Sequence, residues 1–222
     1  MNIKLLFGLL YILFSCFIMG YVDAVWQPGY AIKSGIKIVL FGAVPLFILF
    51  KLSSNHFVEM FQLKWASVWR SAILGIAVYT IIVGGYFLLR DHIDFSNITT
   101  SLNDSVGVNA SNFIFVALYI SIVNSFLEEF FFRGFSYNLL KSKGRTFAYT
   151  ICSIVFALYH VAMMIGWYDW WVFGLAIVAL FGAGIVFHLL NERSGTIYTS
   201  WIVHMCSNLG INTVGLLLFG MI

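Results

Sequence analysis

The sequence predicts an all-α protein, a polytopic bundle of about seven transmembrane helices. Hydrophobic residues make up 61% of the 222 residues and charged residues only 9%, which is too little polar surface to cover a water-soluble globule. The apolar residues fall in runs of about 17 to 25, the length that a helix needs to cross a hydrocarbon core. A transmembrane barrel would instead show short alternating segments.

Seven apolar runs are candidate spans. They are expected at residues 3–22, 35–50, 71–89, 111–132, 147–166, 170–190 and 196–220. The first run resembles a signal peptide, but it is longer than a typical signal core and further spans follow, so we expect an uncleaved anchor. The chain then divides into residues 1–110, with three spans and an exterior loop, and residues 111–222, a helical core.

Basic residues predict the orientation in the membrane. With a cytoplasmic N-terminus, the inner segments hold Lys4, Lys51, Lys64, Arg70, Lys141, Lys143, Arg145 and Arg193. The outer segments then hold Lys33, Lys37 and Arg90. Because cytoplasmic loops carry the excess of Lys and Arg, this distribution favours a cytoplasmic N-terminus. The net charge is only +3, without a long basic block, so nucleic acid is not an expected partner.

Several ionisable residues fall inside predicted spans, where each costs about 3 kcal/mol to insert. Glu129 and Arg133 are four residues apart with the acid first, so they share a helix face and are predicted to form an ion pair. Glu128 points about 100° away on the same helix and has no cationic partner there. It is therefore the predicted general base.

Two other predicted spans carry matching polar residues. His160 in the fifth span can accept or relay a proton, although a lone buried histidine is more often structural. His204 and Asn208 share one face of the seventh span, where two donors can hold an oxyanion. Counted along the helices, Glu128, His160 and Asn208 lie roughly 18 to 20 Å deep and His204 roughly 12 Å. The shared depth favours a functional site over polar contacts that only join helices.

Three motifs in this order resemble those of the CPBP family, the CAAX-protease and bacteriocin-processing intramembrane proteases, also called Abi. They are Glu128-Glu129-Phe130-Phe131-Phe132-Arg133, Phe156-Ala157-Leu158-Tyr159-His160 and His204-Met205-Cys206-Ser207-Asn208, which match E-E-x-x-x-R, F-x-x-x-H and H-x-x-x-N/B. The resemblance covers about residues 111–220. Any one motif is weak, but the ordered set is specific.

The resemblance implies an intramembrane endopeptidase that hydrolyses a peptide bond near or within the membrane. It implies that Glu128 and His160 activate water and that His204 and Asn208 hold the oxyanion. It also implies that Glu129 and Arg133 have a structural, supporting role. The implied partners are a membrane-associated peptide or protein substrate and the lipid bilayer. We expect a multi-pass protein of a bacterial cell membrane.

The sequence leaves the metal question and two other functions open. Glu128, His160 and His204 also have the composition of a zinc site with water in the fourth position, so zinc is an alternative while no cofactor is certain. A non-catalytic scaffold or bacteriocin self-immunity protein is one rival function. A proton-coupled carrier is another, which the lack of internal repeats and of Pro-interrupted half-helices argues against.

Overall fold

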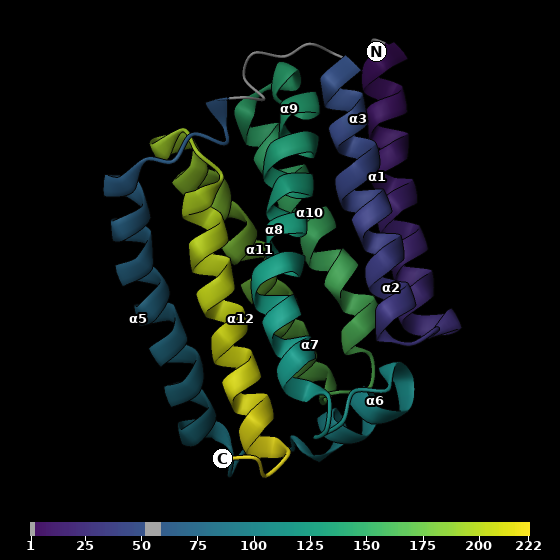
Figure 1. Cartoon of the computed structure of the whole chain (residues 1–222), viewed down its shortest axis with the longest axis vertical. Coiled ribbons are helices and arrows are strands. Elements are labelled where there is room, and N and C mark those ends of the chain that lie inside the picture. The colour runs from purple at the N-terminus through teal and green to yellow at the C-terminus, as the bar shows by residue number, and fades with distance from the viewer. Residues whose placement is uncertain (1–2, 52–58) are drawn as a thin grey trace.

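The computed structural model describes residues 3–51 and 59–222, and over these residues its regular secondary structure is entirely helical (Figure 1). Seven described segments are long and apolar enough to cross a membrane: Leu5–Trp26, Tyr30–Lys51, Trp65–Leu89, Phe113–Lys143, Arg145–Met164, Trp170–Ser194 and Tyr198–Leu218. The predicted all-α class and the expected seven spans are therefore confirmed.

Several spans combine α-helical and π-helical segments. The first joins α1 (Ile3–Tyr21) to the π-helix η1 (Val22–Trp26), and the second joins α2 (Tyr30–Lys37), η2 (Ile38–Ala43) and α3 (Val44–Lys51). The fourth runs through α7 (Phe113–Tyr119), η3 (Ile120–Asn124), α8 (Ser125–Glu129), η4 (Phe130–Ser136), α9 (Tyr137–Leu140) and η5 (Lys141–Lys143). The others are α5 (Trp65–Leu89), α10 (Arg145–Met164), α11 (Trp170–Ser194) and α12 (Tyr198–Leu218). The short α6 (Ser96–Val106) precedes the fourth span.

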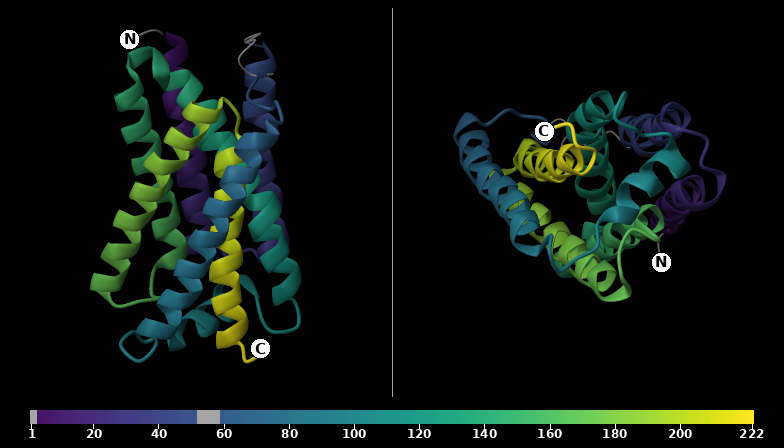
Figure 2. Two further views of the ribbon diagram at one scale, coloured as in Figure 1. Left: turned by 90° about the vertical axis from the view of Figure 1, so that its left-hand side faces the viewer. Right: turned by 90° about the horizontal axis from the view of Figure 1, so that it is seen from below.

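The spans stand roughly upright around the fourth one. Figures 1 and 2 show α5 on one side of the bundle beside α12, and α1 with α2 and α3 on the other side. Helix α10 packs between α11 and α1. The N- and C-termini lie at opposite ends of the bundle, as an odd number of spans requires (Figure 1). This arrangement brings α8, α10 and α12 together in the interior.

The second span begins earlier than expected, at Tyr30 instead of residue 35. As a result Lys33 and Lys37, which we assigned to an exterior segment, lie inside the span and are buried. The exterior assignment was wrong because each lysine has an acidic partner on another part of the chain, which a hydropathy pattern does not show. Lys33 Nζ lies 2.5 Å from Asp23 Oδ1, and Lys37 pairs with Glu128.

A phenylalanine core fixes the fourth span against its neighbours. Phe131, Phe132 and Phe135 of η4 are fully buried. The ring of Phe131 stacks on that of Phe41 from η2, with centroids 4.0 Å apart, and Phe132 meets Phe156 of α10 edge-on at 5.3 Å. Such ring pairs have preferred geometries, so they define orientation as well as burying area. They hold the helix that carries Glu128 and Glu129 in one position.

Candidate active site

The segment that carries the two glutamates, α8, has a π-helix on each side, η3 and η4. A π-helical turn loosens the regular backbone ladder and often marks a functional site. Side chains of α12 bind carbonyls of η3: Trp201 Nε1 donates to the Ile122 carbonyl at 3.0 Å, and Asn208 Nδ2 donates to the Ile120 carbonyl at 3.2 Å. These bonds tie α12 to the glutamate-bearing helix.

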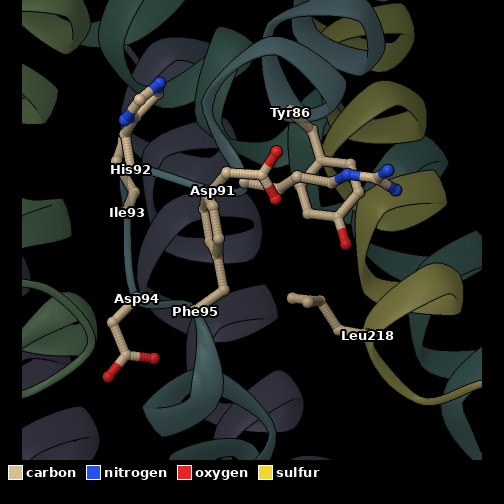
Figure 3. A pocket seen from close by; sticks show the side chains of 8 residues that line it. Tyr86, Asp91, His92, Ile93, Asp94, Phe95 and Leu218 are labelled. Atoms are coloured by element: carbon tan, nitrogen blue, oxygen red, sulfur yellow. The ribbon is translucent and has the colours of Figure 1, made fainter.

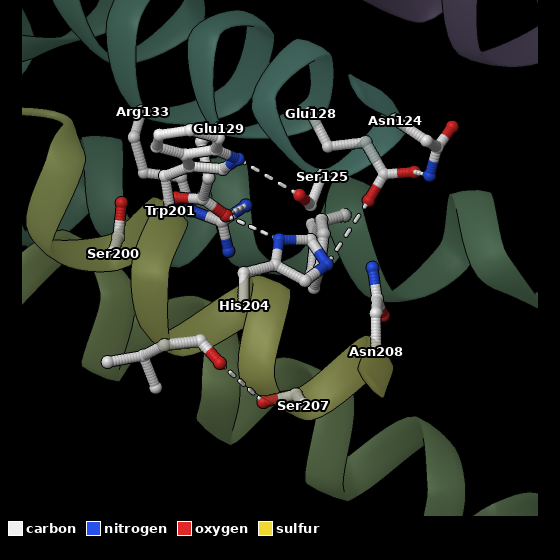
Figure 4. Close-up of polar contacts among 12 residues, drawn as sticks. Asn124, Ser125, Glu128, Glu129, Arg133, Ser200, Trp201, His204, Ser207 and Asn208 are labelled. Carbon is white, nitrogen blue, oxygen red and sulfur yellow. Dashed lines mark hydrogen bonds and ion pairs between the residues drawn. The ribbon is translucent and has the colours of Figure 1, made fainter. Parts of the chain in front are cut away.

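The two oxygens of the buried Glu128 carboxylate have different neighbours. Oε1 accepts hydrogen bonds from Lys37 Nζ and, at 3.0 Å, from Asn124 Nδ2. Oε2 lies 3.5 Å from His160 Nε2 and 3.6 Å from His204 Nε2. Figure 4 shows the carboxylate of Glu128 between Asn124 on one side and His204 on the other. The carboxylate is thus held by one oxygen and presented to two imidazoles by the other.

The partners of the Nδ1 atoms indicate which tautomer each histidine adopts. His160 Nδ1 lies 2.7 Å from the carbonyl oxygen of Phe156, and a carbonyl only accepts, so the hydrogen is assigned to Nδ1. His204 Nδ1 lies 2.8 Å from Glu129 Oε1, and the same reasoning applies to an ionised carboxylate. In the neutral imidazoles both Nε2 atoms then have free lone pairs. In that tautomer they form, together with Glu128 Oε2, a group of three acceptors, and Oε2 itself has no hydrogen-bond partner.

The ion pair that the spacing of Glu129 and Arg133 predicts is present. Arg133 Nη1 lies 3.1 Å from Glu129 Oε1, and both side chains are at most 1% exposed. The guanidinium centre also lies 4.2 Å from the ring centroid of Phe156 and 5.0 Å from that of Phe187. Since Glu129 Oε1 also contacts His204 Nδ1, this pair fixes the imidazole of His204 as well.

The structure therefore brings Glu128, Glu129, Arg133, His160 and His204 into one contact network. The side chain of His204 reaches Glu128, with Nε2 3.6 Å from Oε2, although a shallower position was expected for His204. Asn208 bonds to the backbone of η3, and Figure 4 shows its amide nitrogen pointing towards the side of His204 that faces Glu128.

One comparison with known proteins finds a similarity in the C-terminal part of the chain. Residues 110–210 match the model of a family described as type II CAAX prenyl endopeptidase Rce1-like. These residues form an Rce1-like region. The resemblance to the CAAX-protease family is thereby confirmed, and all three motifs fall inside the matched range. No curated protein and no solved structure matches the chain. With its seven apolar helices, the chain is an integral, multi-pass membrane protein.

Sequence reasoning missed two polar residues that contact Glu128. Lys37 lies outside the Rce1-like region, in the second span, and Asn124 lies one helical turn before Glu128. Glu128 has no cationic partner within its own helix, as expected, but in the folded chain Lys37 of another span pairs with it. The i, i+4 spacing of Asn124 and Glu128 was a usable signal. The only sequence signal for Lys37 was its position beside an apolar run.

A third histidine of the described spans, His188 of α11, is also buried. It is 2% exposed, and its imidazole stacks on the ring of Tyr149 with centroids 4.9 Å apart. The ring centroid of Tyr137 lies 5.4 Å from that of His188, with the two rings tilted. His188 is therefore a buried aromatic-packing residue, separate from the histidines of the Rce1-like motifs.

The arrangement does not fit the zinc site that Glu128, His160 and His204 suggested. Among the residues that the structure describes, no group of three His, Cys, Asp or Glu side chains is arranged to hold a metal ion. A positive charge already contacts the carboxylate, because Lys37 Nζ binds Glu128 Oε1.

A hollow at one end of the bundle is separate from the motif residues of the Rce1-like region. It has a volume of about 440 Å³ and lies where α5 and α12 end, before α6 (Figure 3). Its lining consists of Tyr86, Arg90, Asp91, His92, Ile93, Asp94, Phe95 and Leu218. The side chains that line it include none of the predicted site residues.

Proposed function

We propose that the chain is an intramembrane endopeptidase that hydrolyses a peptide bond near or within the membrane, in a membrane-associated substrate of the CAAX type. The observation that carries this proposal is the acceptor group of Glu128 Oε2, His160 Nε2 and His204 Nε2. A water molecule that enters this group donates its hydrogens to strong acceptors, which makes its oxygen more nucleophilic. The match to a family of prenyl endopeptidases supports the substrate class.

In the proposed reaction, Glu128 and His160 remove a proton from water as its oxygen bonds to the scissile carbonyl carbon. The proton taken from water passes from Glu128 Oε2 to His204 Nε2, 3.6 Å away, which can then donate it. The tetrahedral oxyanion that forms is held by this hydrogen of His204 and by the second amide hydrogen of Asn208. The proton taken from water then passes to the amide nitrogen. The C–N bond breaks, leaving a new carboxyl group and a new amine.

Glu129 and Arg133 support this reaction without touching the substrate. Glu129 Oε1 accepts from His204 Nδ1 at 2.8 Å, so it sets the direction of the imidazole. Arg133 balances the charge of Glu129 in the buried interior. An orienting carboxylate behind a working histidine is a common arrangement, because it fixes both the tautomer and the ring plane.

The direct test measures release of the C-terminal tripeptide from a farnesylated CAAX peptide by the purified chain in liposomes. We expect Glu128→Gln to lower kcat by about 100-fold to 10,000-fold, because the amide keeps the size of the side chain but not its basicity. Glu192→Gln is the matched control. Glu192 is a glutamate of α11 that binds Tyr149 and Arg145, away from the site, so this variant should remain active.

Two results would count against the proposal. A Glu128→Gln variant with wild-type turnover would remove the proposed base. A wild-type chain that folds, yet releases no tripeptide from prenylated or other membrane-bound peptides, would favour the non-catalytic scaffold or self-immunity role.

A further inference from the structure

Lys37 is a buried cation in the middle of the second span, where a charged side chain costs about 3 kcal/mol to insert. Its side chain is 4% exposed, and that of its partner Glu128 is 2% exposed. The residue comes from the N-terminal part of the chain, before the Rce1-like region. A charge buried in this way needs compensating interactions, and the contacts of Lys37 show which groups provide them.

Lys37, Asn124 and Glu128 form a closed triangle of hydrogen bonds. Lys37 Nζ donates to Glu128 Oε1 and to Asn124 Oδ1, while Asn124 Nδ2 donates to the same Oε1 at 3.0 Å. Oε1 thus accepts two hydrogen bonds from groups that are themselves joined. Such a triangle prevents the carboxylate from rotating, so Oε2 stays directed at the two imidazoles.

Aromatic rings enclose the rest of the ammonium group. Nζ lies 4.9 Å from the ring centroid of Tyr159 and 5.5 Å from that of Phe41, which is within the range of cation–π attraction. Tyr159 belongs to α10 and is the residue before His160. The ammonium is therefore surrounded by protein groups and does not face the acceptor group that would receive water and substrate.

We infer that Lys37 is a positioning residue for the proposed base: with Asn124 it holds Oε1 of Glu128 so that Oε2 is the only oxygen presented to water. The inference rests on the proposed function. Catalytic groups lose rate steeply when they are displaced, by as much as about 100-fold for 1 Å. The second span therefore supplies a residue of the site, Lys37, that lies outside the motifs of the Rce1-like region.

The same helix offers a matched control in Lys33, one turn before Lys37. Lys33 Nζ lies 2.5 Å from Asp23 Oδ1 and 3.9 Å from Met163 Sδ. It is a largely buried, ion-paired lysine of the same span, but its contacts do not include Glu128. If kcat depends only on keeping a buried ammonium group, replacing either lysine should lower kcat equally. If it depends on the contact with Glu128, only replacement of Lys37 should lower kcat.

The experiment compares kcat, KM and the thermal unfolding midpoint for Lys37→Met, Lys37→Arg, Lys33→Met and Asn124→Ala in the full chain. We expect Lys37→Met to lower kcat by about 10-fold to 100-fold with KM within about two-fold, because binding surfaces are unchanged. Lys37→Arg should recover part of kcat, since it keeps the charge and the donors. Lys33→Met should retain kcat.

Asn124→Ala keeps the inference testable if Lys37→Met does not fold, because it removes the other donor to Oε1 without unbalancing a charge. It should lower kcat by about 10-fold. Wild-type kcat in Lys37→Met or, where that variant does not fold, in Asn124→Ala would overturn the inference. So would equal losses of kcat in Lys37→Met and Lys33→Met. Glu128→Gln, measured in parallel, separates the two proposals: if it is inactive while Lys37→Met is fully active, only the positioning role fails.

Discussion

Arg133 shows at the level of one residue how a charge is kept inside this bundle. Its guanidinium lies 3.1 Å from the carboxylate of Glu129 and against the faces of Phe156 and Phe187. Removing one partner of a buried ion pair leaves the other charge without compensation, which costs about 3 to 5 kcal/mol. The stability of the site therefore depends on the pair and not on either charge alone.

We expect Arg133→Met to lower the free energy of unfolding by about 3 to 5 kcal/mol, measured by denaturant unfolding in detergent. The control is the double variant Glu129→Gln with Arg133→Met, which removes both charges and should recover much of that loss. Equal destabilisation in the single and double variants would contradict this account of the pair.

The sequence predicted the local relations between site residues and the grouping of its three motifs, but it missed several individual contacts between distant residues. The Glu129–Arg133 pair follows from a four-residue spacing on one helix, so it was predictable. The contact between Lys37 and Glu128 joins residues of different helices, 91 positions apart, and no local pattern encodes it. The bond from His204 to Glu129, across 75 positions, was missed for the same reason.

At the scale of the elements, α10 and α11 approach closely at one glycine. A Cβ added at Gly184 would lie 2.8 Å from Cβ and Oγ of Ser153 and 3.0 Å from its Cα. Small residues permit such close contacts between membrane helices. At Gly174, by contrast, an added Cβ would meet nothing within 4 Å, so that position does not form such a contact.

We expect Gly184→Ala to lower the thermal unfolding midpoint, because the backbone of α10 must move to accept the methyl group, at a cost of about 1 to 3 kcal/mol. Gly182→Ala is the control on the same helix, since a Cβ there meets nothing within 4 Å. It should be at least as stable as the wild type, because alanine favours helix. A Gly184→Ala variant as stable as Gly182→Ala would disprove the close contact.

The π-helical segments are the elements that sequence reasoning could not predict. Both η3 and η4 lie within a continuous apolar run, and such a run has the same composition whether its turns are α-helical or π-helical. What distinguishes η3 here is tertiary: Asn208 and Trp201 of α12 donate to its carbonyls. The helix count was therefore predictable, while the local winding around the glutamates was not.

At the scale of the whole molecule, the corrected second span changes the charge distribution that sets orientation. With Lys33 and Lys37 buried in the span, Arg90 is the remaining basic residue of the three that we assigned to exterior segments. The asymmetry that favours a cytoplasmic N-terminus thus becomes larger. The seven spans followed from run length alone, because the thickness of the bilayer constrains every one of them.

A cysteine introduced at Asp91 should react with a membrane-impermeant maleimide added to intact cells, because we expect this exposed loop to face outward. A cysteine at Lys143, which is also exposed, should react only after the cells are opened. The parent chain, whose Cys16, Cys152 and Cys206 lie within spans, gives the background. The reverse labelling pattern would show a cytoplasmic C-terminus.

The link between Lys37 and Glu128 has a consequence for how the protein is made. The first two spans leave the ribosome before the motif-bearing helices, and the carboxylate of Glu128 meets its counter-charge only when these helices dock with them. A newly inserted fourth span that has not yet docked therefore carries an unbalanced acid in lipid. Assembly of the bundle and completion of the proposed base are one event, so a partly assembled chain lacks a complete hydrolytic centre.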